Sequence, residues 1–113
     1  MLPIRHDINM VINNSITLKI EFESAIENIN DIYFTAKDNV GKIITQKSLN
    51  NGITRDGQDI VVRLKPNDTD NLVDGYIYNY DVVVKYNANT DRQTIVYGSL
   101  KIKKLTTMPS DEV

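Results

Sequence analysis

The feature that most constrains this chain is an alternation of apolar and polar side chains with a period of two residues. In the segment 16–22, apolar residues occupy every second position, and Thr17, Lys19 and Glu21 lie between them. A period of two places successive side chains on opposite faces of an extended strand. No long stretch keeps the spacing of an amphipathic helix. The sequence therefore predicts an all-β fold.

Turn-forming residues separate the alternating segments. The predicted strands cover 8–12, 16–22, 32–37, 42–49, 60–64, 76–86 and 93–104. Turn signals recur about every 8 to 12 residues, which is typical of an antiparallel β-sandwich. We expect an immunoglobulin-like or fibronectin III-like β-sandwich of about seven strands, with a β-barrel as the alternative that the pattern leaves open.

Four local features refine this prediction. The longest strand, 76–86, is expected at the centre of the sheet. The segment 50–57 contains two glycine turn signals and is expected to be an exposed, mobile loop. Asp68 or Thr69 is expected to cap one short turn of helix. Gly98 marks a bulge or a close approach of two backbones.

Composition indicates one domain without disulfide bonds. We assign residues 1–105 to a single β-sandwich domain and 106–113 to a polar C-terminal tail. The 113 residues include no cysteine, so apolar burial and strand pairing must hold the fold. A net charge of −2 gives no attraction for nucleic acid, and the longest apolar runs span only a few residues. We therefore expect neither a nucleic-acid nor a membrane partner.

No residue pattern indicates catalysis. The single histidine, His6, stands beside Asp7, but no nucleophile or second ligand is indicated near it. We expect a solvated or edge-strand histidine. The chain also has no glycine-rich phosphate loop and no serine nucleophile elbow. The sequence predicts a protein that is not an enzyme, with no catalytic residue and no cofactor.

One loop gathers carboxylates that are candidate calcium ligands. Asp68, Asp70 and Asp74 lie close together, and calcium prefers oxygen ligands. Their spacing lacks the glycine and the terminal glutamate of an EF-hand loop. Helix capping and turn formation explain these residues better, so we predict no metal site and keep the three as calcium candidates.

The tyrosines divide into two groups. Those of the longest predicted strand share one face, which favours core packing over a sugar-stacking platform; they are Tyr76, Tyr78, Tyr80 and Tyr86. Tyr33 and Tyr97 lie on other strands. We expect these two to be partly exposed and available to a partner, as interface residues.

The stretch LVDGYIY at 72–78, which precedes the long strand, resembles the corner that leads into the sixth strand of immunoglobulin and fibronectin III domains. That resemblance implies a structural role for Tyr78. Its hydroxyl would donate a hydrogen bond to the upstream backbone.

A second resemblance covers most of the chain. The segments IYFTAK at 32–37, LKPNDT at 64–69, GYIYNYDV at 75–82 and TIVYGSL at 94–100 look like small immunoglobulin-like proteins from the structural modules of tailed phages and prophages. This chain departs from their pattern by placing two residues, Asn79 and Tyr80, between the second tyrosine of this stretch and Asp81. The resemblance implies a virion component of the head, tail or baseplate, which is assembled in the bacterial cytoplasm.

Two functions follow from these observations. The first is a non-catalytic structural or assembly protein that acts through protein–protein contacts, as a homo-oligomer or with virion proteins. The alternative is a carbohydrate-binding or cell-surface-binding module. Its site would consist of the loops 50–59 and 87–92 and any exposed tyrosines.

Overall fold

The alternating segments form β-strands in the computed structural model, which describes residues 3–11, 14–22, 28–69, 72, 75–86 and 91–103. These ranges contain β1 (Ile4–Arg5), β2 (Ile8–Val11), β3 (Ile16–Glu21), β4 (Ile29–Lys37), β5 (Ile43–Leu49), β6 (Gly52–Asp56), β7 (Asp59–Leu64), a 3₁₀ turn η1 (Pro66–Asp68), β8 (Ile77–Tyr86) and β9 (Arg92–Lys103). The all-β prediction is confirmed. The predicted tail 106–113 and most of the predicted last hairpin lie outside the described residues.

The described residues form nine strands rather than about seven. One addition is the two-residue β1, and the other is β6, which occupies the segment predicted to be a mobile loop. The exposure is confirmed for most of 50–57, but the loop assignment was wrong because the two glycine signals make separate turns with a strand between them, with positive φ at Asn50, Gly52 and Gly57. Between these turns Ile53 enters the core and is 0% exposed. Burial of Ile53 and antiparallel pairing with β7 hold this segment as a strand.

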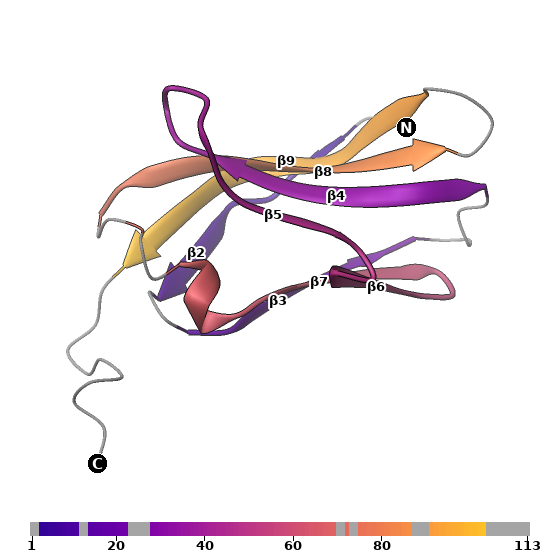
Figure 1. Cartoon of the computed structure of the whole chain (residues 1–113), viewed down its shortest axis with the longest axis horizontal. Helices are drawn as coiled ribbons and strands as arrows, with labels where there is room; N and C mark the ends of the chain where they lie inside the picture. The colour runs from indigo at the N-terminus through magenta and orange to yellow at the C-terminus, as the bar shows by residue number, and fades with distance from the viewer. Residues whose placement is uncertain are drawn as a thin grey trace, which may run out of the picture.

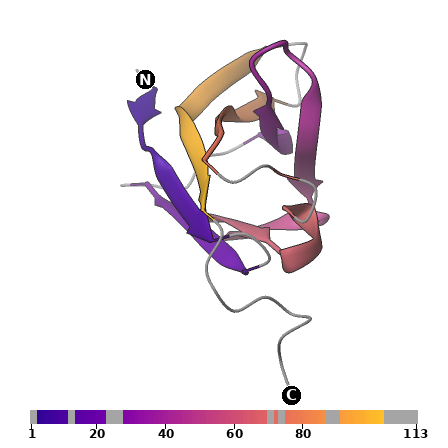
Figure 2. The same ribbon diagram turned by 90° about the vertical axis from the view of Figure 1, so that its left-hand side faces the viewer.

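Hydrogen bonds join the strands into one continuous sheet in the order β1-β9-β8-β4-β5-β6-β7-β3, and β2 also pairs with β9. Three of the pairings are parallel, β1–β9, β2–β9 and β5–β6, so the sheet is not purely antiparallel. The sheet curls round, and β9, β8 and β4 lie opposite β3, β7 and β6 (Figure 1). Viewed along another axis, the ribbon encloses a central space (Figure 2).

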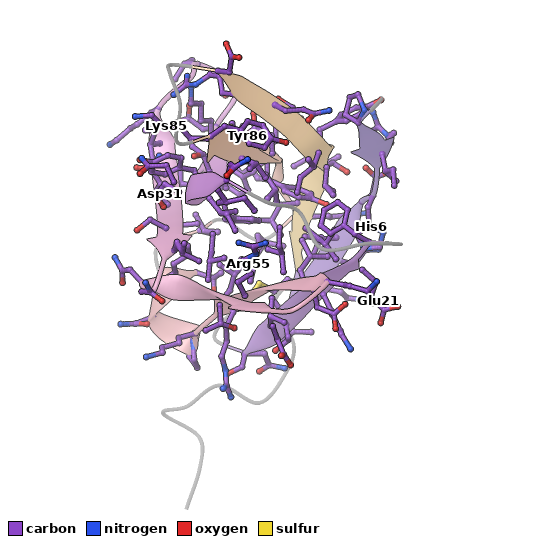
Figure 3. The ribbon with its side chains drawn as sticks, turned by 90° about the vertical axis from the view of Figure 1, so that its right-hand side faces the viewer. His6, Glu21, Asp31, Arg55, Lys85 and Tyr86 are labelled. Carbon is purple, nitrogen blue, oxygen red and sulfur yellow. The ribbon has the colours of Figure 1, made fainter. Side chains whose placement is uncertain are left out.

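Side chains from the inner surface of the curl fill this space (Figure 3). The central position of β8 is confirmed, because it pairs with β4 on one side and β9 on the other. Its Tyr80 ring stacks on Phe34 with 5.3 Å between the ring centroids. On β3, the predicted alternation is confirmed, since Ile20 is buried whereas Thr17 and Lys19 are exposed.

The N-terminal segment is held against β9 at one glycine. Gly98 lies directly against the backbone of His6, so the predicted close approach is confirmed. The His6 amide donates to the Tyr97 carbonyl at 2.9 Å, and the Ser99 amide donates to the Asp7 carboxylate at 3.0 Å. The Tyr80 hydroxyl donates to the His6 carbonyl. These contacts fix the short break between β1 and β2.

The only helical turn among the described residues begins earlier than predicted. It covers Pro66–Asp68 and its N-cap residue is Lys65, so Asp68 is the third residue of the turn and caps its start from inside, as in a capping box. Proline suits the first position of a helix because its φ is already fixed there. The Asp68 carboxylate accepts a 2.6 Å hydrogen bond from the Lys65 amide and a 2.8 Å bond from Lys47 Nζ. Asp68 thereby joins this turn to β5.

Candidate interaction surface

The outer surface of β5, β4, β8 and β9 brings together the two tyrosines that the sequence singled out. Across this surface Tyr33 stands opposite Val83, and Tyr97 stands opposite Asp81. Thr35 is the partner of Asp81 on the other side. Since partners in register share one face of a sheet, all five side chains point outward from the same surface. Below, we call these five residues the outer face.

A shallow hollow of about 370 Å³ lies on this surface. It is lined by residues from four neighbouring strands, among them Thr35 and Lys37 of β4, Gln46 of β5, Asp81 and Val83 of β8, and Arg92 of β9. Thr35, Asp81 and Val83 are half-buried even though they lie on the outside of the sheet, whereas Lys37 and Gln46 are exposed. The hollow therefore shields Asp81 from part of the solvent.

Asp81 is the unusual group in the hollow. Burial raises the pKa of its carboxyl above the ordinary value of 3.8, and the nearby Lys37 charge only partly opposes this. Among the described residues, no side chain or amide forms a hydrogen bond or ion pair with this carboxylate. A charge without a partner in a shielded place is costly to the isolated protein. The Asp81 carboxylate can accept a hydrogen bond from a donor group of a partner molecule.

The groups around Asp81 are held in place. The Gln46 amide donates to Thr35 Oγ1 at 3.0 Å. A hydrogen bond to Asp31 raises the pKa of the Tyr33 hydroxyl. The Arg5 guanidinium lies 5.8 Å from the centre of the Tyr97 ring, which remains 39% exposed. Each of the two tyrosines thus has a polar neighbour within the chain.

The remaining tyrosines follow the prediction with one exception. Tyr78 and Tyr80 are buried, and half-buried Tyr86 donates to Gln93 Oε1 at 3.0 Å. Tyr76 is 56% exposed, contrary to the expected core position, because β8 begins only at the next residue. The hydrogen bond expected from the Tyr78 hydroxyl to the upstream backbone stays a prediction.

The other sequence candidates do not meet at one site. His6 is exposed and makes its contacts through its main chain, on the side of the molecule away from Asp31 and Lys85 (Figure 3). Asp68 already binds Lys47, while Asp70 and Asp74 lie outside the described residues. Within the described ranges, no group of three acidic, histidine or cysteine side chains is placed to hold a metal ion.

Asp81 was not singled out by sequence reasoning. Its position on the polar side of the long strand, between Asn79 and Val83, predicts only that it faces outward. What gives it significance is the shielding by β4 and β5, which are far from it in the sequence. The apolar Val83 at the next outward position was the one available signal, since it interrupts the polar side of the strand.

Within the part of the chain that the structure describes, no helix has the length and apolar character needed to cross a membrane.

Comparison with known proteins gives likenesses among solved structures alone. No protein-family model matches this chain, and a search of curated proteins finds no match. Among solved structures, the chain is similar to the extracellular domain of the voltage-gated sodium channel beta4 subunit, with a TM-score of 0.45 and 16% identity over 94% of this chain and 97% of that one. That domain forms parallel homodimers, which explain its role in cell–cell adhesion. At this TM-score the likeness assigns no family.

Proposed function

We propose that this chain is a non-catalytic immunoglobulin-like module that binds protein through its outer face, as a structural component of a tailed-phage or prophage particle. The observation that carries the binding role is Asp81, a half-buried carboxylate whose cross-strand neighbours are Thr35 and Tyr97 and for which no hydrogen bond or ion pair is described. A partner that donates a hydrogen bond to this carboxylate would offset its cost.

The immunoglobulin-like assignment is supported by the order of the strands. One layer would consist of β9, β8, β4 and β5, and the other of β3, β7 and β6. In this scheme β4 and β8 take the places of strands C and F, and β3 and β7 those of strands B and E. The short β5–β6 contact would then be a bridge between the edges of the two layers.

The phage assignment is supported by the sequence resemblance in β4, β8 and β9. A virion protein is present in many copies, so weak contacts can be repeated around a symmetric assembly. A small, fixed face such as this one suits repeated contacts between copies or with a neighbouring virion protein. The particle would be assembled in the bacterial cytoplasm.

The outer face has the composition of a protein interface. Tyrosine offers a flat apolar surface and a polar end, and it is enriched at protein–protein interfaces. Thr35 and Val83 add an uncharged centre. The face therefore combines apolar contact area with one half-buried acceptor, an arrangement that favours a specific protein partner over a general electrostatic one.

Asp81→Lys is the variant that tests the binding role, because it replaces the acceptor with a cation at the centre of the face. Light scattering of the purified chain would measure self-association, and pull-down of purified head and tail proteins from the same genome would measure partner binding. We expect the wild type to associate in one of these assays and Asp81→Lys to lose that association. Lys19→Glu, at an exposed position of β3 away from the outer face, is the control and should keep the association.

Two results would count against the proposal. The first is a wild-type chain that stays strictly monomeric and binds no head or tail protein. The second is association that Asp81→Lys leaves intact. Labelling of induced particles with an antibody to this chain would test the virion location separately, and unlabelled particles would contradict it.

The carbohydrate-binding alternative has less support. Its proposed loop 50–59 contains β6 and its two turns, and the Arg5 guanidinium already lies over the ring of Tyr97. A stacking platform needs a free ring face. Binding on a glycan array that is lost in Tyr97→Ala would favour this alternative over the protein-binding proposal.

A further inference from the structure

A second hollow lies on the layer formed by β3, β7 and β6. Its volume is about 260 Å³, and its lining includes Thr17, Lys47, Thr54, Val61, Arg63 and Lys65. Thr17 is the cross-strand partner of Arg63, and Thr54 is that of Val61, so these side chains share the outer surface of the layer. We call this site the basic hollow.

The basic hollow has no acidic residue in its lining, but it has three basic ones, Lys47, Arg63 and Lys65. Half-buried Lys47 is already paired, because its Nζ binds the Asp68 carboxylate at 2.8 Å. Arg63 and Lys65 are exposed, and neither forms an ion pair with any residue that the structure describes. The hollow therefore carries two unpaired cations in a chain whose net charge is −2.

The acidic residues of this layer are too far away to neutralise Arg63. They lie side by side in register at the other end of the strands and are Glu21, Asp56 and Asp59. Asp59 is four residues from Arg63 along β7, which is about 13 Å at about 3.3 Å per residue. Salt screens exposed charges beyond about 8 Å at physiological ionic strength. Between them, Lys19 binds Glu21 and Asp59 at 3.3 and 3.5 Å.

The size and the donors of the basic hollow suit one small anionic group. Its volume is below the range of about 300–1,000 Å³ that is typical of pockets for drug-sized ligands. An arginine guanidinium can donate to both oxygens of one carboxylate. The exposed hydroxyls of Thr17 and Thr54 add two donors, and half-buried Val61 offers apolar contact to the methylene groups of an acidic side chain.

The main chain around the basic hollow favours a carboxylate over a phosphate. Phosphate sites are commonly built from free backbone amides at a helix N-terminus or a tight turn. Here the Asn51 amide donates to the Ser48 carbonyl at 2.9 Å, and the Lys65 amide donates to the Asp68 carboxylate at 2.6 Å. Both amides border the hollow and are already used. The side-chain donors that remain suit the two oxygens of a carboxylate.

We propose that the basic hollow binds the carboxylate of an aspartate or glutamate side chain on a partner protein. Arg63 would donate to both oxygens, Lys65 would add a second positive charge, and the hydroxyls of Thr17 and Thr54 would donate from the neighbouring strands. This inference rests on the proposed function in that the ligand belongs to a protein. The basic hollow and the outer face lie on opposite layers (Figure 1), so the two surfaces contact different neighbours.

The probe is a short synthetic peptide with glutamate at its centre, titrated into the isotopically labelled full chain at low salt. We expect it to shift the amide signals of Thr17, Thr54 and Arg63, and to bind less tightly as the salt concentration rises. The same peptide with glutamine in place of glutamate should not shift them. Equal binding of the glutamine peptide, or tighter binding of inorganic phosphate than of the glutamate peptide, would overturn the proposal.

Two arginine variants separate the basic hollow from a general effect of charge. Arg63→Gln removes the guanidinium and should weaken binding of the glutamate peptide at least about tenfold. Arg55→Gln is the matched control, because Arg55 is exposed on β6 but does not line the hollow, and it should bind as the wild type does. Equal weakening by both variants would refute a specific site. Lys65→Gln covers the case in which Arg63→Gln does not fold; it should also weaken binding, and unchanged affinity would contradict the inference.

Failure of this inference is distinct from failure of the proposed function. If virion proteins bind through Asp81 while the glutamate peptide does not bind, only the basic hollow proposal is lost. If the peptide binds through Arg63 while Asp81→Lys leaves association intact, the outer-face proposal is lost and the basic hollow proposal stands.

Discussion

Gly98 and His6 lie so close that no side chain fits between them: a Cβ at position 98 would stand 2.7 Å from the carbonyl carbon of His6. The two residues are far apart in the sequence, and their contact holds the N-terminal segment against β9. The same His6 carbonyl accepts the hydroxyl of Tyr80. The absence of a side chain at position 98 thus allows the segment between β1 and β2 to lie against β9.

Gly98→Ala should lower the free energy of unfolding by about 3 kcal/mol, because the backbone around His6 must move to admit the methyl group. Urea denaturation of the purified chain would measure this change. Lys101→Ala, an exposed substitution in β9, should have little effect. Equal stability of Gly98→Ala and the wild type would show that the N-terminal segment does not need this contact.

The Tyr80 hydroxyl should make the protein sensitive to alkali. Burial raises the pKa of Tyr80 to about 12, and the charge of Asp7 adds to the effect. Since the unfolded tyrosine ionises near 10.0, its contribution to stability is complete below that pH and is lost as the pH rises towards about 12. Tyr80→Phe should remove this alkaline loss and also the bond to His6. Denaturation curves at about pH 9 and about pH 11 would compare the stability of the wild type with that of Tyr80→Phe.

Tyr76→Phe is the matched control for the alkaline experiment, because Tyr76 is exposed. It should keep the same fall in stability at high pH as the wild type. An alkaline loss that persists undiminished in Tyr80→Phe would assign the effect to another group.

The Lys47–Asp68 pair should contribute more to stability than the exposed ion pairs. Its side chains are only 16% and 13% exposed, whereas those of Lys19 and Glu21 are 54% and 70% exposed. Asp68→Asn leaves the Lys47 ammonium without its charge partner and should cost about 3 kcal/mol. Thermal unfolding would measure this. Lys19→Met is the control and should change far less; equal effects would contradict a special role for the shielded pair.

Asp81→Asn should stabilise the isolated chain at neutral pH. Burial raises the pKa of this carboxyl, so its contribution to stability is complete below about pH 4 and falls as the pH rises through the folded-state pKa. The gain should stay below about 1 kcal/mol, because solvent screens a half-exposed charge. It should disappear near pH 3. A destabilised Asp81→Asn at pH 7 would mean that the carboxylate has a stabilising partner within the chain.

Much of the fold could be predicted because alternation is a local property. The segments of β3, β4, β7 and β8 were assigned correctly, and Gly98 was identified as a close approach from one glycine within a strand. The segment of β6 was missed, since a single isoleucine between two turn signals does not make an alternating pattern. Its strand character comes from burial of Ile53 against distant residues.

Much less of the candidate site could be predicted. Tyr33 and Tyr97 were selected as available aromatic residues, but nothing in the sequence places them on the same surface. Along the chain Asp81 is marked only by the apolar Val83 at the next outward position, because its shielding comes from strands β4 and β5.

The amino-acid sequence alone determined that the chain forms strands, where most of them begin and end, and which side of each faces inward. It could do so because side-chain direction in a strand depends only on position along the chain. The tertiary structure alone decided which strands pair, that β2 and β3 attach to different neighbours, and that Asp81 is shielded on an outer surface. Pairing and shielding join residues that are far apart in the sequence, and no local pattern contains that information.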